Sequence, residues 1–319
     1  MTSLRLCHKC FIVLSNTRTK QYQLIKICGK VLQNNPRSCQ NSIATQSSRF
    51  NSTSTADSPN AHTTIDQDEH HKFTKLASHW WDEKGEFYAL HSMNRLRIPL
   101  IRDAFVDASD KESKIFPLKD KLILDVGSGG GIIAEPLARL GATVTGIDMV
   151  EENVRIAQTH ISQDPEISGH VNYIHGAVED LPEEGKFDAV VASEVVEHVS
   201  DVDMFISSCC KLIKPGGYFF LTTLNKTYAS YLLAVLGAEH LLRIVPPGTH
   251  DWNKFIPPED LQLSLEQNGM TVRLLHGMCY NPVINRWSWI SNTDINYAMY
   301  AVKSTQSIHS HDTIEQTDY

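Results

Sequence analysis

The regular alternation of two kinds of segment between residues 121 and 223 restricts the possible folds of this 319-residue chain more than any other feature. Short apolar segments predict strands, and longer segments with apolar residues every three or four positions predict helices. The predicted strands are 121–125, 142–147, 171–175, 187–192 and 218–223, and the predicted helices between them are 132–140, 150–163 and 202–213. Strands that are apolar along their whole length are typical of a parallel sheet covered on both faces, so an α/β fold is predicted.

The segments on either side of this alternation complete the predicted sheet. Residues 68–81 and 90–106 read as N-terminal helices, and a further helix is predicted from Pro257 to about Asn268. The last two strands are predicted at 270–278 and 295–303, with irregular sequence between them. Since no helix joins these two strands, they are predicted to form an antiparallel hairpin. The expected fold is a seven-stranded, mostly parallel sheet with this terminal hairpin at its edge and helices at its N-terminus.

Charge is divided unevenly along the chain. Residues 1–56 contain eight Lys and Arg residues and no Asp or Glu, and subtracting these eight charges from the formal −8 of the whole chain leaves about −16 for the remainder. A basic, polar and acid-free N-terminus is typical of a mitochondrial transit peptide, with a disordered basic tail as the alternative. We therefore expect a transit peptide at 1–56, a folded domain at 66–303 with a helical first part at 66–110, and a disordered tail at 304–319. The acidic domain would repel phosphates, so nucleic acid is not an expected partner.

A glycine-rich turn follows the first strand of the alternation. Gly127, Gly129 and Gly131 lie between a predicted strand and a predicted helix, where glycines let a ligand approach the backbone. Asp148 ends the next strand 21 residues after Gly127, a position from which a carboxylate can accept hydrogen bonds from ribose hydroxyls. A nicotinamide-dependent oxidoreductase shares these features, but Asp125, directly before the turn, would repel a pyrophosphate and attract a cationic ligand. The Gly-x-Gly-x-Gly spacing and Asp125 therefore favour S-adenosylmethionine.

Several separated motifs extend this interpretation to a family. The motif Asp125-x-Gly127-x-Gly129-x-Gly131, Asp148, the strand at 187–191 and the Lys-Pro-Gly-Gly segment at 214–217 together resemble the class I S-adenosylmethionine-dependent methyltransferases, over residues 120–303. Four segments resemble more specifically the ubiquinone-biosynthesis O-methyltransferases, and these are 90–97, 141–149, 194–199 and 248–255. The resemblance implies a Rossmann-like fold and O-methylation of catechol-type polyprenylated intermediates, namely polyprenyl dihydroxybenzoate and demethylubiquinol. A non-catalytic, cofactor-binding scaffold within a biosynthetic complex is the alternative function.

The resemblance also implies which residues contact S-adenosylmethionine. The family pattern assigns this role to Arg97, Gly127, Asp148 and Ser193, and we add Asp125 and Gly129 because they belong to the same turn. Bacterial relatives have Met where this chain has Ser193, so a backbone contact at this position would be retained, whereas a packing contact on adenine would be lost. The alternative role for Arg97 is an ordinary surface ion pair, and for Asp148 it is that of a turn residue.

Two carboxylates and an imidazole follow the fourth strand of the alternation: Glu194, Glu197 and His198. If a helix begins at Ser193 or Glu194, these side chains lie within about 100° of arc and converge. A capping box does not explain their placement, because it requires Glu or Gln at position 196, which is Val. A divalent cation bound by the three side chains would lower the pKa of a catechol oxygen and prepare it for methylation. The resemblance favours Mg²⁺, and the alternatives are His198 as a metal-free general base and a purely structural role.

A broken apolar segment at 228–245 is the remaining feature with functional content. No apolar run in the chain is long enough to span a bilayer, but this segment is amphipathic enough to lie on one or to line an apolar pocket. A core helix is the alternative. The polyprenylated substrate implied by the resemblance predicts peripheral association with the matrix side of the mitochondrial inner membrane, within a multi-protein ubiquinone biosynthesis complex. His250 and Asp251 are further candidates for the mouth of the acceptor site.

Overall fold

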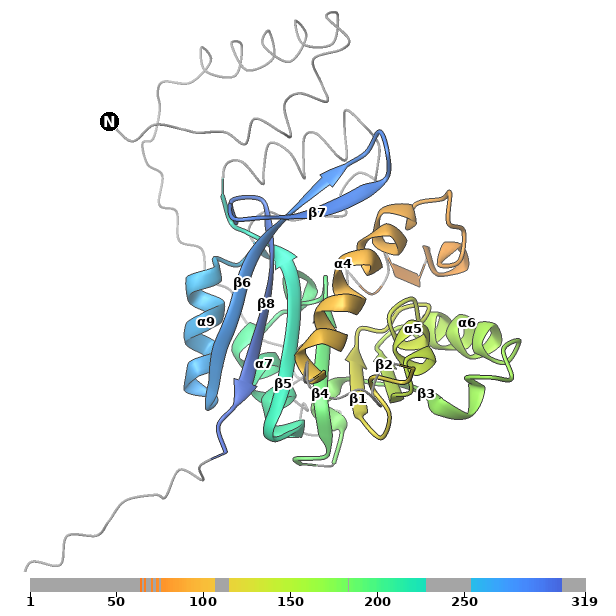
Figure 1. Ribbon diagram of the computed structural model, residues 1–319, viewed down its shortest axis with the longest axis horizontal. Helices are drawn as coiled ribbons and strands as arrows, with labels where there is room; N and C mark the ends of the chain where they lie inside the picture. The colour runs from red at the N-terminus through yellow and green to blue at the C-terminus, as the bar shows by residue number, and fades with distance from the viewer. Residues whose placement is uncertain are drawn as a thin grey trace, which may run out of the picture. The chain divides into compact units, whose positions relative to one another are not determined.

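The computed structural model describes residues 64, 66, 70, 73–74, 76–106, 115–182, 184–227 and 254–305. These residues form an eight-stranded sheet in the order β3-β2-β1-β4-β5-β8-β6-β7, with helices on both faces (Figure 1). The strands are β1 (Leu122–Val126), β2 (Thr143–Asp148), β3 (Val171–His175), β4 (Phe187–Ser193), β5 (Ile213–Leu224), β6 (Met270–Asn281), β7 (Arg286–Ile290) and β8 (Asn296–Lys303). The α-helices are α4 (Tyr88–Phe105), α5 (Ala134–Arg139), α6 (Glu151–Ile161), α7 (Val202–Leu212) and α9 (Pro258–Gln267), and the 3₁₀ helices are η1 (Ala77–His79), η3 (Ser168–His170), η4 (Val178–Asp180) and η5 (Val196–His198).

The predicted α/β class is confirmed, and the number of strands differs by one. β1 to β5 are parallel, and β8 lies antiparallel between β5 and β6. The additional strand, β7, pairs antiparallel with β6 in a stretch that was expected to be irregular. Only Trp287 of its five residues is buried, so the hydrophobic alternation that would predict a strand is weak at this edge of the sheet.

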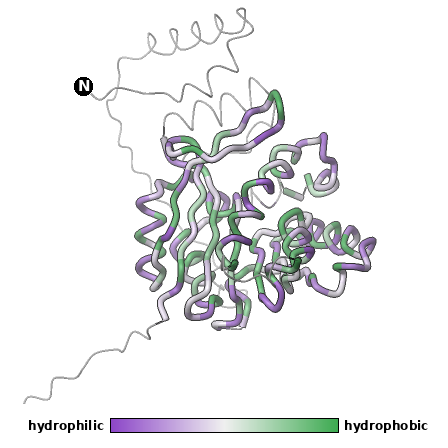
Figure 2. Tube along the Cα trace, in the orientation of Figure 1, coloured by the Kyte–Doolittle hydropathy of each residue, from purple (hydrophilic) through white to green (hydrophobic). Residues whose placement is uncertain are grey.

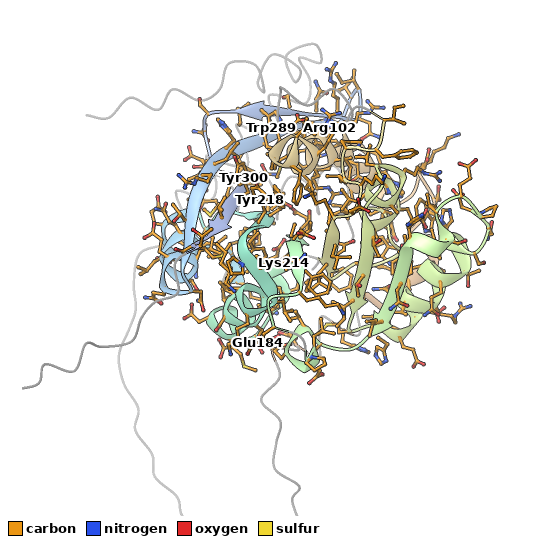
Figure 3. The ribbon with its side chains drawn as sticks, turned by 60° about the horizontal axis from the view of Figure 1, so that its bottom comes forward. Arg102, Glu184, Lys214, Tyr218, Trp289 and Tyr300 are labelled. Carbon is orange, nitrogen blue, oxygen red and sulfur yellow. The ribbon has the colours of Figure 1, made fainter. Side chains whose placement is uncertain are left out.

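Each face of the sheet buries its own hydrophobic core. One core contains apolar side chains of α7 and α9, and the other contains side chains of α4, α5 and α6. Along β5 the two faces alternate: Phe219 and Leu221 belong to the first core and Phe220 to the second. Tyr218 of β5 lies beside Tyr300 of β8 on the second face, with ring centroids 6.2 Å apart (Figure 3). Burial on both faces explains why the central strands are apolar throughout.

Local sequence signals explain where several helices begin and end. α7 begins where the Asp201 carboxylate accepts a hydrogen bond from the Met204 amide (2.9 Å), and Pro258 occupies the first turn of α9. α5 ends just before Gly141, whose φ of 100° is in the left-handed region, as expected for a glycine that closes a helix. α5 is two residues shorter at its start than the predicted helix, because Ile132 and Ile133 belong to the preceding turn.

Some predictions concern segments outside the described residues. These are the transit peptide at 1–56, the broken apolar segment at 228–245, the pair His250 and Asp251, and the tail beyond residue 305. Within the part of the chain that the structure describes, no helix combines the length and the apolar character needed to cross a bilayer. Hydrophobic stretches follow the central strands and recur at the turn between β6 and β7 (Figure 2).

Candidate active site

The glycine turn connects β1 to α5 and is tied to the end of β2. Because β1 lies between β2 and β4, the turn is at the point where the strand order reverses, which is where open α/β sheets bind ligands. The amides of Gly127 and Ser128 donate to the Ile147 carbonyl (2.8 and 3.1 Å), and the Gly129 amide donates to Oδ2 of Asp148 (2.8 Å). The structure therefore brings Gly127, Gly129 and Asp148, three of the predicted cofactor residues, into one place.

Side chains of the protein itself lie against these glycines. A Cβ atom at Gly127 would fall 2.5 Å from the Val195 side chain, and Cβ atoms at Gly129 and Gly130 would each fall 2.4 Å from the Trp80 side chain. Gly127 and Gly129 also have φ values of 66° and 53°, which glycine adopts without strain. These glycines are thus required by internal packing and by the turn itself, in addition to the ligand approach that the sequence suggested.

Two buried carboxylates flank the turn. Oδ1 of Asp148 accepts hydrogen bonds from the Val150 amide (2.9 Å) and from the side-chain amide of Asn153 (3.1 Å). Asp125 is 1% exposed, and its Oδ2 has no hydrogen-bond partner among the described residues. Burial raises the pKa of Asp125 to about 7, although the positive charge of Arg97 acts in the opposite direction. A buried carboxyl group with an unpaired oxygen is suited to a ligand that brings positive charge or a hydrogen-bond donor.

Arg97 reaches the site from α4 and is buried. Its guanidinium donates to Oδ1 of Asn94 (2.7 and 3.1 Å), to Oγ of Ser193 (2.8 Å) and to a backbone carbonyl of its own helix (2.7 Å). Burial lowers the pKa of Arg97 to about 10, despite the neighbouring carboxylates of Glu194 and Asp125. Arg97 is therefore not a surface ion-pair residue, and it joins α4 to the end of β4 at the predicted cofactor site.

The prediction that a helix begins at Ser193 or Glu194 is wrong. Ser193 is the last residue of β4, and Glu194 has a φ of 59°, in the left-handed region that interrupts regular structure. A single 3₁₀ turn, η5, follows at Val196–His198, and α7 begins only at Val202. The arc of 100° was calculated for a continuous α-helix and does not apply to this segment.

The carboxylates of Glu194 and Glu197 consequently lie on opposite faces of the sheet. Oε1 of Glu194 accepts a hydrogen bond from Oγ1 of Thr222, and Oε2 of Glu197 accepts one from Oγ1 of Thr223, each at 2.7 Å. Thr222 and Thr223 are consecutive residues of β5, so their side chains point to opposite faces. The described residues contain no group of three or more His, Cys, Asp and Glu side chains that could hold a metal ion. In this structure Glu194, Glu197 and His198 do not form a metal site.

The surroundings of Glu197 and His198 still differ from those of ordinary surface residues. Glu197 is 3% exposed, and its Oε1 has no hydrogen-bond partner in the described part of the chain. The His198 ring is half-buried and meets the Phe73 ring edge to face, with centroids 5.1 Å apart. Both side chains are thus held close to the carboxyl end of β4.

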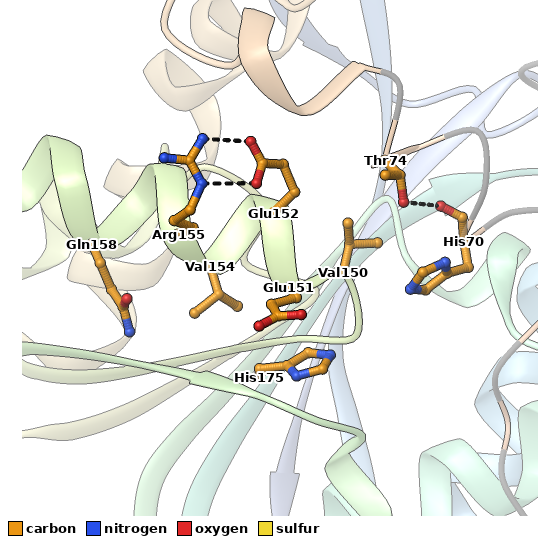
Figure 4. Close-up of a pocket in the computed structure, with 9 residues that line it drawn as sticks. All are labelled: His70, Thr74, Val150, Glu151, Glu152, Val154, Arg155, Gln158 and His175. Carbon is orange, nitrogen blue, oxygen red and sulfur yellow. Dashed lines mark hydrogen bonds and ion pairs between the residues drawn. The ribbon is translucent and has the colours of Figure 1, made fainter.

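A cavity of about 620 Å³ opens beside Asp148, around the beginning of α6 (Figure 4). It is lined by His70, Thr74, Val150, Glu151, Glu152, Val154, Arg155, Gln158 and His175. Arg155 and Glu152 form an ion pair on its wall, with nitrogen to oxygen distances of 2.5 and 2.8 Å. The cavity begins two residues beyond Asp148, and none of its lining residues was singled out from the sequence.

Sequence reasoning also missed several side chains that contact the predicted site residues. Trp80 lies on the glycine turn, Asn153 contacts Asp148, and Thr222 bridges Ser193 and Glu194. Trp80 and Trp81 are the last two residues of the predicted helix at 68–81, and such a pair is an uncommon local signal. Asn153 and Thr222 lie within apolar periodic segments and carry no signal of their own.

Comparisons with known proteins agree with this arrangement. A family model described as a methyltransferase domain matches residues 124–221, which include the glycine turn and β4. The mitochondrial ubiquinone biosynthesis O-methyltransferase of Homo sapiens is 49% identical over 249 residues, covering 77% of this chain and 68% of that protein. The ubiquinone biosynthesis O-methyltransferase of Methylobacterium nodulans is 44% identical over 239 residues, covering 74% of this chain and 95% of that protein. The chain, with its methyltransferase domain and its Rossmann-like α/β sheet, therefore belongs to the ubiquinone biosynthesis O-methyltransferase family.

Proposed function

We propose that this protein transfers a methyl group from S-adenosylmethionine to a catechol-type oxygen of polyprenylated intermediates in ubiquinone biosynthesis. The observation that carries this proposal is Asp125, a buried carboxyl group with an unpaired oxygen at the reversal point of the sheet. Such a group suits a cationic methyl donor and opposes an anionic dinucleotide, so it disfavours an oxidoreductase. The names of the relatives support the pathway, and the sequence resemblance supplies the substrates, polyprenyl dihydroxybenzoate and demethylubiquinol.

We assign the contacts of the donor to the residues around the glycine turn. S-adenosylmethionine supplies a methyl group on a positively charged sulfur. Asp148 would accept a hydrogen bond from the ribose of S-adenosylmethionine. Its carboxylate has roughly four acceptor positions, and three protein donors occupy all but about one of them. Asp125 would offset the positive charge of the methyl donor, and Arg97 and Ser193 would face its polar end from α4 and β4. Gly127 and Gly129 would let it approach the turn.

The acceptor oxygen must lose its proton for methyl transfer, because a neutral phenol with a pKa near 10 is a weak nucleophile at neutral pH. We propose His198 as the group that removes this proton. It stands on η5, directly after the end of β4, and the contact with Phe73 restrains its ring. An imidazole can act as a general base for such a proton.

A divalent cation at Glu194, Glu197 and His198 is a separate proposal that rests on the sequence resemblance. The side chains do not fit it as they stand, since the two carboxylates lie on opposite faces of the sheet. We therefore route no step of the reaction through a metal ion. The unpaired Oε1 of Glu197 and the left-handed backbone of Glu194 are the two features that would favour a rearranged turn around a cation.

The test is methyl transfer from radiolabelled S-adenosylmethionine to a short-chain catechol analogue, before and after exhaustive chelation and with Mg²⁺ added back. We expect O-methylated product from the intact protein and none from His198→Ala. Retention of full activity after chelation would contradict the cation proposal, whereas loss that Mg²⁺ restores would support it.

Two further experiments address the rival functions. Calorimetry with S-adenosylhomocysteine and with NADH separates the methyltransferase from an oxidoreductase. A non-catalytic scaffold would retain pathway function in both His198→Ala and Glu194→Ala. The enzyme would lose it in His198→Ala, and the cation proposal adds the same loss in Glu194→Ala.

We also propose that the protein works on the matrix side of the mitochondrial inner membrane, in a ubiquinone biosynthesis complex. The basic N-terminal composition and the mitochondrial names of mammalian relatives support this location, and a polyprenylated substrate would reside in the bilayer. Flotation of purified protein with liposomes tests the association. Unchanged flotation after deletion of residues 229–245 would show that this segment is not the anchor.

A further inference from the structure

Two adjacent tryptophans and the start of α4 hold the glycine turn from outside. We call residues 76–97 the N-terminal strap. Trp80 is 7% exposed, stacks on Phe87 with ring centroids 3.9 Å apart, and lies directly against Gly129 and Gly130. The strap lies outside the matched methyltransferase domain at 124–221, so its contacts with the turn are additional to that domain.

A chain of hydrogen bonds leads from Trp80 to the carboxylate that we assign to the ribose. Nε1 of Trp80 donates to Oδ1 of Asn153 (2.8 Å), and Nδ2 of Asn153 donates to Oδ1 of Asp148 (3.1 Å). All three side chains are buried. An indole N–H can only donate, so it requires the carbonyl oxygen of the Asn153 amide to face Trp80 and the amino group to face Asp148.

The orientation of the Asn153 amide determines which part of Asp148 is open to a ligand. With the amino group in place, Oδ1 of Asp148 receives two donors, from Val150 and Asn153, while Oδ2 receives only the Gly129 amide. If the amide turned over, its carbonyl oxygen would face the carboxylate and repel it. The indole N–H of Trp80 therefore fixes the Asn153 donor to Oδ1, and with it the orientation in which the Asp148 carboxylate presents Oδ2.

From this geometry we propose that Trp80 is a positioning residue for S-adenosylmethionine: through Asn153 it fixes the Asp148 carboxylate that receives the ribose. The inference rests on the ribose contact of Asp148 in the proposed function. Trp80 of the N-terminal strap would thus contribute to the affinity for the methyl donor. It would take no part in the chemical step.

Trp81 provides a matched control on the same strap. Its Nε1 also donates a hydrogen bond, to the Gly130 carbonyl (2.9 Å), and its ring stacks on His160 with centroids 3.5 Å apart. Among the described residues, it makes no hydrogen bond to Asp148 or Asn153. Trp80→Phe and Trp81→Phe thus make the same chemical change, the loss of one indole N–H, at neighbouring positions.

The experiment measures the binding of S-adenosylhomocysteine and of its analogue without ribose hydroxyls to the full-length protein by calorimetry. We expect Trp80→Phe to weaken S-adenosylhomocysteine binding by about three- to tenfold, the effect of one buried hydrogen bond. The affinity for the hydroxyl-free analogue should stay unchanged. The KM for S-adenosylmethionine should rise by a similar factor, with kcat and the KM for the catechol unaffected. Trp81→Phe removes a hydrogen bond to the Gly130 carbonyl of the turn and not to Asn153, so any loss of affinity that it causes should be equal for the two ligands.

Asn153→Ala tests the same chain independently of the indole ring. It should reproduce the loss caused by Trp80→Phe, and the double variant should lose no more than either single variant, because both break one linkage. A loss in Trp80→Phe that is equal for S-adenosylhomocysteine and its hydroxyl-free analogue, or full additivity with Asn153→Ala, would overturn the role of Trp80. Equal affinity of the wild type for both ligands would instead overturn the ribose contact of Asp148, and this inference with it.

Discussion

Asp125 links the stability of the protein to pH. Its pKa is about 7 in the folded chain because burial disfavours the charged form, whereas an Asp in an unfolded chain has a pKa of about 3.9. Between these two pH values the folded state keeps a proton on Asp125 that the unfolded state has released. The free energy of unfolding therefore falls as the pH rises: the contribution of Asp125 is complete below about pH 4 and is lost by about pH 7. We predict that Asp125→Asn reduces the fall in melting temperature of the ligand-free protein between pH 4.5 and 7.5.

Other buried acids limit the size of that change. Burial also raises the pKa of Asp148 and of Glu135, so these two acids make stability depend on pH in the same direction. The slope of melting temperature against pH should therefore be smaller in Asp125→Asn than in the wild type, but not zero. An identical slope in wild type and Asp125→Asn would show that Asp125 ionises normally in the folded chain. Asp103→Asn, at an exposed position on α4, is the control that should leave the slope unchanged.

The same residue should couple donor binding to proton release. A positively charged ligand next to Asp125 favours its carboxylate and lowers its pKa, so binding near pH 6 should release up to about one proton. We predict this release for S-adenosylmethionine, measured by calorimetry in buffers of different ionisation enthalpy, and expect it to diminish toward pH 8.5. The Asp125→Asn protein should bind without this proton release, and a release as large as that of the wild type would place the proton on another group.

At the level of single residues, the sequence identified the acids at the strand ends but not the partners that orient them. Asp125 ends one predicted strand and Asp148 follows the next, so their location needed only the βα alternation. Thr222 and Thr223, which separate the carboxylates of Glu194 and Glu197, come from β5, and their effect depends on strand register. The left-handed φ of Glu194 has no sequence signal, because Glu is uncommon in that region.

At the level of elements, a lysine from β8 completes the end of α7. Nζ of Lys303 donates to the carbonyls of Cys210 and Ile213, each at 2.8 Å, at the end of α7, where the Cys210 carbonyl also accepts the Ile213 amide. We predict that Lys303→Met lowers the free energy of unfolding by about 1–2 kcal/mol, measured by urea denaturation. Lys211→Met, at an exposed position on α7, is the control and should change it by less than about 0.5 kcal/mol.

The position of most elements followed from the sequence, and the exceptions have a common cause. The predicted strand at 171–175 matches β3, and the predicted helix at 90–106 differs from α4 by only one or two residues at each end. β7 was missed and a helix at 194 was wrongly expected, because both segments are stabilised by contacts with distant residues. β7 pairs with β6 and buries Trp287, whose Nε1 donates to the Ala89 carbonyl of α4 (2.9 Å). Local periodicity does not carry that information.

At the level of the whole molecule, the class of sheet could be predicted, but not the way in which the N-terminal strap reaches the glycine turn. Strands that are apolar on both faces require two helical layers, so the layered arrangement follows from residues such as Phe219 and Phe220 of β5. Trp80 stacks on Phe87 within the strap, and its contact with Gly129 joins segments about fifty residues apart. Nothing in the spacing of the motifs indicates which helix covers the turn.

The turn between β6 and β7 should contribute to the proposed membrane association. Val283 and Ile284 at this turn are 73% and 61% exposed, while the hairpin itself is anchored to α4 through Trp287. Two adjacent exposed aliphatic side chains at the end of a fixed hairpin can enter the interfacial region of a bilayer, where burial of apolar area is favourable. We predict that replacing both with Asp reduces flotation with anionic liposomes several-fold.

Leu263 of α9 gives the matched control, since its side chain is 56% exposed but lies on a helix and not on the hairpin. Leu263→Asp should float like the wild type if the hairpin position matters, whereas equal losses in both proteins would indicate a general effect of added negative charge. Turnover of a water-soluble catechol should be the same in all three proteins, because the hairpin tip is not among the residues assigned to the donor or to proton transfer. Loss of turnover together with flotation would mean that the substitutions disturb the α4 side of the site, and the membrane role of the hairpin would then be rejected.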